Sequence, residues 1–132
     1  MQPEGRKPGT PQEWLRRAKS NLTLASQPKL EQVYWEDLCF EAQQAAEKAI
    51  KAVLVFKGMR FRFVHDIAEL LTLFEQHEVP VPEVVRAAAA LTDYSVEARY
   101  PGPFEPVTEN EFTEALHIAK AVVSWAENQI SL

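Results

Sequence analysis

One short stretch of the chain, Lys57 to Asp66, brings arginine, histidine and aromatic residues together. An extended backbone places alternate side chains on opposite faces, and we expect this over residues 59–63. Its apolar residues then face the core: Met59, Phe61 and Phe63. Its two arginines share the outer face near Lys57: Arg60 and Arg62. His65 lies just beyond, where a new helix is expected to begin.

The polar residues of this stretch suit phosphate chemistry. Arginine binds phosphate through two parallel hydrogen bonds, a helix N-terminus attracts anions, and histidine transfers protons near neutral pH. The candidate catalytic residues are therefore Arg60 and His65, and the candidate nucleotide- or phosphate-binding residues are Lys57, Arg62 and Asp66. A purely structural interpretation stays open, in which Asp66 caps a helix and the arginines are solvated loop charges.

A second candidate site is Arg99 and Tyr100, which lie in a segment with three prolines and a glycine. Tyrosine can stack on a base while arginine pairs with a phosphate, so both are candidate nucleotide-binding residues. Alternatively, Tyr100 anchors the loop to the protein and Arg99 pairs with a carboxylate such as Glu97.

Composition narrows the classes of function. The net charge is −5, so tight binding of nucleic acid would need a local basic patch or a basic partner. The single cysteine, Cys39, excludes an intramolecular disulfide, and no Cys/His spacing resembles a zinc site. With no glycine-rich phosphate loop either, we expect no metal and no cofactor, and no conventional hydrolase or kinase site.

The spacing of apolar residues, together with the capping residues, predicts five amphipathic helical segments. They cover about 10–26, 31–57, a segment from 65 onward, 84–97, and a segment from 108 onward. Short loops between such helices predict an all-α fold, an up-and-down antiparallel bundle of four to five helices. Residues 10–132 then form one domain behind a polar, proline-rich tail, 1–9, which we expect to be disordered.

The expected location is cytoplasmic, with no membrane partner. No apolar run approaches the roughly 20 residues that span a bilayer, and the first nine residues lack the apolar core of a signal peptide.

Residues 39–52, CFEAQQAAEKAIKA, resemble the hallmark second helix of HEPN (higher eukaryotes and prokaryotes nucleotide-binding) domains. Further short motifs fit the small prokaryotic branch of that family: Gly58, His65-Asp66-Ile67 and Arg99-Tyr100-Pro101. The resemblance extends from about residue 11 to residue 129. It implies a helical bundle that is usually a homodimer. Many members are encoded beside a small nucleotidyltransferase and form a toxin–antitoxin-like module with it.

The resemblance also implies an enzymatic alternative, because some members are metal-independent endoribonucleases. These carry an arginine, four to six intervening residues and a histidine, and Arg60 and His65 have that spacing. In those members a polar residue tends to follow the arginine, whereas Phe61 follows Arg60 here. The order of hypotheses is therefore a nucleotide-binding or accessory subunit, then an endoribonuclease, then a non-catalytic dimerisation module.

Overall fold

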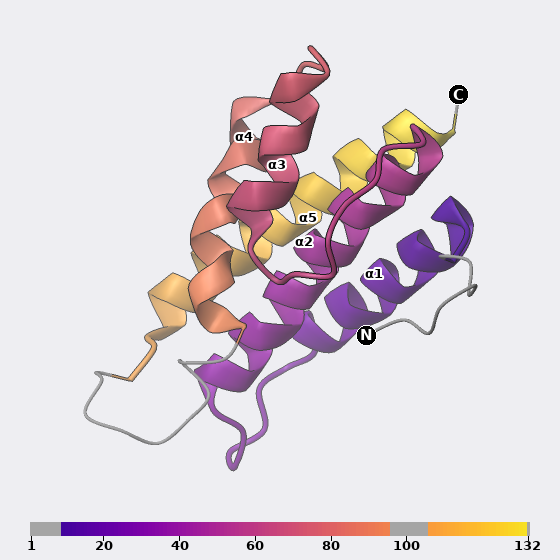
Figure 1. Cartoon of the computed structure of the whole chain (residues 1–132). Helices are drawn as coiled ribbons and strands as arrows, with labels where there is room; N and C mark the ends of the chain where they lie inside the picture. The colour runs from indigo at the N-terminus through magenta and orange to yellow at the C-terminus, as the bar shows by residue number, and fades with distance from the viewer. Residues whose placement is uncertain (1–8, 96–105, 132) are drawn as a thin grey trace.

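The computed structural model of the chain describes residues 9–95 and 106–131, and all regular secondary structure in these ranges is helical. The elements, labelled in Figure 1, are α1 (Pro11–Ala25), α2 (Trp35–Phe56), α3 (Ile67–Gln76), α4 (Glu83–Arg86), the 3₁₀ helix η1 (Ala87–Tyr94) and α5 (Glu109–Ile130). The predicted all-α, up-and-down bundle is confirmed. Most of the predicted tail, 1–9, and the candidate residues Arg99 and Tyr100 lie outside the described ranges.

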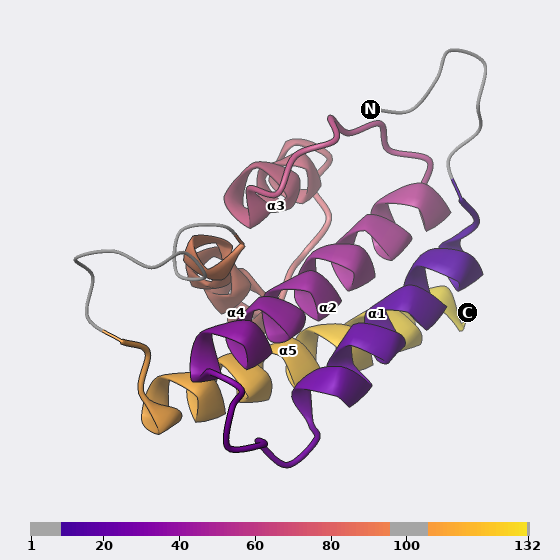
Figure 2. The ribbon, with the colours of Figure 1, turned by 90° about the horizontal axis from the view of Figure 1, so that it is seen from below.

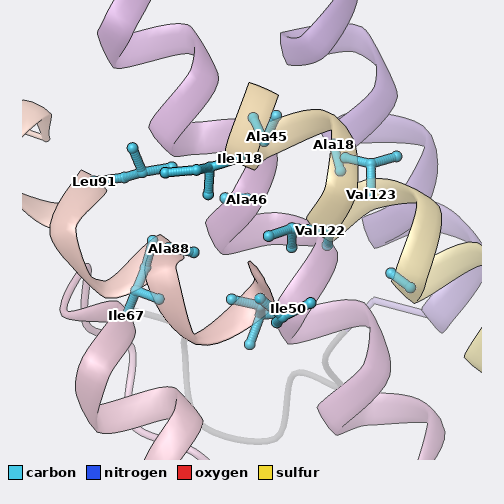
Figure 3. Packing of buried hydrophobic residues seen from close by; sticks show 14 of the residues in the cluster. Ala18, Ala45, Ala46, Ile50, Ile67, Ala88, Leu91, Ile118, Val122 and Val123 are labelled. Atoms are coloured by element: carbon cyan, nitrogen blue, oxygen red, sulfur yellow. The ribbon is translucent and has the colours of Figure 1, made fainter. Parts of the chain in front are cut away.

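Helix α2 is the centre of the bundle. It packs against α1 and α5 along its length and against η1 and α3 on another side (Figures 1 and 2). A run of small residues lets these neighbours approach closely, and all of them are fully buried: Ala42, Ala45, Ala46, Ala49 and Ala52. Figure 3 shows larger side chains from α3, η1 and α5 converging on Ala46 and Ile50 of α2.

The predicted start of the second helix is wrong. The second helix begins at Trp35 rather than near residue 31, because Leu30 to Val33 form a turn and Tyr34 is extended. Its first turn is acidic, with Glu36 and Asp37 placed where the helix macrodipole favours negative charge.

The predicted fourth helix, 84–97, is α-helical only over α4 and continues as the tighter η1. Its buried residues are spaced by three: Val85, Ala88 and Leu91. A 3₁₀ helix has three residues per turn, so this spacing keeps all three on the core side. The last two predicted positions of this helix, 96–97, lie outside the described residues.

Helix ends follow the expected capping chemistry. Thr10 with Glu13, and Thr108 with Glu111, form the predicted capping boxes at the starts of α1 and α5. Gly58 directly follows the C-cap of α2 and has a φ of 70°, a conformation that glycine adopts at no steric cost.

We expect Gly58→Ala to destabilise the protein by about 1 kcal/mol in urea unfolding. An added Cβ would contact nothing within 4 Å, so the cost comes from the backbone conformation rather than from a clash. Gly58→Asn is the matched control, and it should cost less because asparagine tolerates positive φ. Equal losses for both variants would contradict this explanation.

Candidate functional site

The segment 57–66 runs back along α2 before it enters α3 (Figure 1). Phe61 anchors it by an edge-to-face contact with Trp14 of α1, with ring centroids 6.4 Å apart. Met59 and Phe61 are partly buried against the core, as predicted. Phe63 is 54% exposed, so its predicted core position is wrong. The Val64 N–H donates to the Arg62 carbonyl, and this tight turn breaks the alternation of side chains.

Beneath this segment, α2 carries three buried polar side chains at intervals of four residues: Gln43, Glu47 and Lys51. Each is at most 4% exposed, and the spacing places all three on one side of the helix. Lys51 Nζ lies 2.8 Å from Glu47 Oε2, and Gln43 Nε2 donates to Glu47 Oε1 at 2.8 Å. The Glu47 carboxylate is therefore hydrogen-bonded by side chains one turn before it and one turn after it on the same helix.

His65 completes this cluster from the segment above. Its Nδ1 lies 3.0 Å and 3.2 Å from the two carboxylate oxygens of Glu47. An ionised carboxylate only accepts hydrogen bonds, so we infer that Nδ1 carries the proton. The imidazole is 62% exposed, and its Nε2 makes no hydrogen bond to the residues that the structure describes. Glu47 thus fixes the ring and leaves one nitrogen free for a ligand.

Electrostatics keep Glu47 ionised. Burial by itself would raise the pKa of Glu47, but the hydrogen bond and charge of Lys51 outweigh it, with help from Gln43 and His65. The net result is a lowered pKa. Lys51 is further stabilised by two aromatic rings, because its Nζ lies 5.7 Å from the centroid of Trp14 and 5.8 Å from that of Phe61.

The other predicted site residues separate into two groups. Arg62 forms a bidentate pair with Glu69, and Asp66 caps α3 by accepting the Ala68 N–H at 3.0 Å. Arg60 and Lys57 are exposed, and neither side chain forms an ion pair or hydrogen bond within the described part of the chain. The first group already has partners in the protein, whereas Arg60 and Lys57 are free to meet an anion.

The sequence reasoning missed Gln43, Glu47 and Lys51, although all three lie inside the helical motif. One signal was available, since Glu47 and Lys51 form an i,i+4 pair of opposite charge within an alanine-rich run. Such pairs are usually exposed, whereas this one lies beneath residues of α1 and of the segment 57–66. Among the described residues, no group of three or more His, Cys, Asp or Glu side chains is arranged to hold a metal ion.

Comparison with known families decides the identity of the fold. The model of the HEPN domain family matches residues 11–129, which is most of the chain. The chain belongs to the HEPN domain family. The resemblance seen in its second helix is thereby confirmed over the whole bundle. No curated protein matches this HEPN chain.

Two solved structures resemble this HEPN chain closely. One is a crystal structure of ST0689, an archaeal HEPN homologue, with 30% identity, a TM-score of 0.74, and coverage of 93% of this chain and 99% of that one. The other is TT1696 from Thermus thermophilus, with 34% identity, a TM-score of 0.73, and coverage of 90% and 97%. Both alignments cover nearly the full length of the neighbour's chain. Within the ranges described, no helix is both long and apolar enough to traverse a bilayer.

Proposed function

We propose that this HEPN chain is a cytoplasmic, homodimeric subunit that binds a nucleotide or RNA phosphate at His65 and acts with a nucleotidyltransferase in a toxin–antitoxin-like module. One observation carries the binding part of the proposal, the exposed imidazole held by the buried Glu47 carboxylate. A ring fixed through Nδ1 presents Nε2 in a defined direction. This favours a ligand-binding role for His65 over that of a mobile surface histidine. Arg60 and Lys57, on the same segment and unpaired, supply positive charge.

Family membership supports the partner part of the proposal. Many small HEPN proteins resembling this one are encoded beside a nucleotidyltransferase, and a subunit of such a module meets nucleotides as substrates or products of its partner. The acidic net charge of −5 also fits a protein that binds a small phosphate ligand at one local basic site.

The test is binding of AMP, ADP and ATP, measured by thermal shift and calorimetry. A nucleotide at about one hundred times its Kd should add about 2.7 kcal/mol of stability to the wild type. His65→Ala should lose most of this gain, whereas His77→Ala, an exposed histidine bonded only to its own helix, should retain it. No shift with any nucleotide would refute binding, and a pull-down from the native host that recovers no nucleotidyltransferase would refute the partnership.

A second function, metal-independent RNA cleavage, is favoured by the Glu47–His65 hydrogen bond. A carboxylate that orients an imidazole is a common arrangement for proton transfer. In this mechanism His65 Nε2 exchanges a proton with the ribose 2′-OH or the leaving oxygen, while Arg60 neutralises the phosphate. The bound carboxylate does not itself need to gain a proton.

This alternative is tested by incubating RNA with the protein in EDTA. Cleavage should yield ends with 2′,3′-cyclic phosphate, and His65→Ala should reduce the rate by roughly 10²–10⁴-fold. Arg60→Ala should also slow cleavage, whereas Arg86→Ala, at the distant α4, should not. Equal rates for the His65 variant and the wild type would assign the cleavage to a contaminant.

A further inference from the structure

A second group of cations lies on the seam between α1 and α2. Lys48 directly follows Glu47 in α2 and is half-buried in this seam. Its Nζ donates to Asn21 Oδ1 of α1 at 2.8 Å, and Asn21 Nδ2 donates to Glu41 Oε1 at 2.7 Å. The second bond orients the amide so that its oxygen faces Lys48. A half-buried ammonium is therefore held by a neutral oxygen, with no ion pair to the described residues.

Arg17 adjoins Lys48 from the α1 side, one helical turn before Asn21. Its side chain is exposed and likewise has no ion pair within the ranges described. It lines two surface hollows, one of about 250 Å³ with Glu13 and Arg16, and one of about 150 Å³ with Gly9, Glu13 and Trp14. The buried indole Nε1 of Trp14 lacks an acceptor among the described residues. The hollows are thus lined by the positive charge of Arg17 together with the Glu13 carboxylate.

The electrostatic neighbours of Lys48 are two cations, Arg17 and Lys51, and two carboxylates, Glu41 and Glu47. Burial lowers the pKa of Lys48, and repulsion from Arg17 and Lys51 lowers it further, against the attraction of Glu47 and Glu41. Both carboxylates already accept hydrogen bonds, Glu47 from the cluster under His65 and Glu41 from Asn21. Glu13 is engaged in the capping box of α1. Glu41 keeps its negative charge while it accepts from the neutral Asn21 amide, so an anion that enters the seam meets two cations and one carboxylate on α2 that no cation pairs.

We propose that Arg17 and Lys48 bind a second phosphate group of the ligand that His65 holds. This inference rests on the proposed function and names its ligand more closely, as a molecule with at least two phosphates. Lys48 follows Glu47, the α2 residue that holds His65, so a ligand that bridges the two sites must extend about 100° around α2. The second phosphate has two chemical sources, the diphosphate of a nucleotide or the next linkage of an RNA strand.

The experiment compares AMP, ADP and pentaadenylate RNA by calorimetry, using the wild type and the double variant Arg17→Gln/Lys48→Gln. The double variant should bind ADP, RNA or both about tenfold more weakly, the order of one lost charge-assisted hydrogen bond, and should bind AMP unchanged. Weakening of ADP alone assigns the seam to a diphosphate, and weakening of RNA alone assigns it to a phosphodiester chain. For RNA, the plot of log K against log salt has a negative slope, and its magnitude should decrease by about 0.7 for each cation removed.

Controls separate this inference from the proposed function and from misfolding. Arg86→Gln removes one positive charge from α4, and Lys48→Arg keeps the charge in the seam; both should bind like the wild type. Unchanged thermal unfolding establishes that the double variant is folded. If His65→Ala weakens all ligands while the double variant weakens none, the second phosphate site is wrong and the proposed function stands. If His65→Ala weakens none, the proposed function fails.

Discussion

Replacing Glu47 with leucine is expected to destabilise the protein by about 3–5 kcal/mol in urea unfolding. The change leaves the Lys51 ammonium, only 4% exposed, without its ion-pair partner. It also releases Gln43 and His65, which donate to the same carboxylate. A buried charge that loses its partner costs far more than the pair itself contributes, because the desolvation of the remaining ion is no longer offset.

Two controls identify burial as the cause. The double variant Glu47→Leu/Lys51→Leu removes both charges and should be more stable than Glu47→Leu alone. Glu127→Leu breaks the exposed pair with Lys19, 2.6 Å long, and should cost less than about 1 kcal/mol. Equal costs at Glu47 and Glu127 would contradict the role of burial.

The same interaction predicts a dependence on pH. Lys51 lowers the pKa of Glu47 below its ordinary value of 4.5, so the stabilisation is fully present above about pH 4.5. It is lost as the pH falls through the lowered pKa of the folded state. The stability difference between wild type and Glu47→Gln should therefore shrink in acid, measured by urea unfolding from about pH 7 to pH 3. A difference that stays constant over this range would contradict an ionised Glu47.

Phe74→Ala is also expected to destabilise the protein, lowering the free energy of unfolding by about 3–5 kcal/mol. Phe74 is fully buried in α3 and meets Trp125 of α5 edge to face, with ring centroids 5.6 Å apart. Truncation leaves a cavity between the two helices and removes the aromatic contact. Because α3 begins directly after His65 and Asp66, its loosening should also speed hydrogen exchange in the segment that carries the candidate site.

Matched variants test this explanation. Phe74→Leu fills most of the cavity and should cost less than the alanine variant. Phe63→Ala removes the same side chain from a position that is 54% exposed. Urea unfolding should show a loss of stability of about 0.5 kcal/mol or less. A comparable loss at Phe63 would mean that the segment 57–66 contributes more to stability than its exposure indicates.

Local sequence was enough to predict most helices of this protein. Capping boxes, the glycine after α2 and the spacing of apolar residues are interactions within a few residues of the chain, so they are readable without a structure. The family could also be read from the second helix, because its alanine-rich motif is contiguous. The same reasoning failed where local rules compete, at the start of α2 and along η1.

The tertiary structure alone decided how the candidate site is built. His65 was identifiable as a reactive residue type, but its partner Glu47 lies 18 residues away on a different element. Nothing local distinguishes Glu47 and Lys51 from an exposed i,i+4 pair. Phe61 and Trp14, from two other elements, lie over Lys51, and His65 contacts Glu47. The sequence by itself therefore determined the bundle and one candidate histidine. Packing between elements determined which charges are buried, which are paired and which remain free for a phosphate.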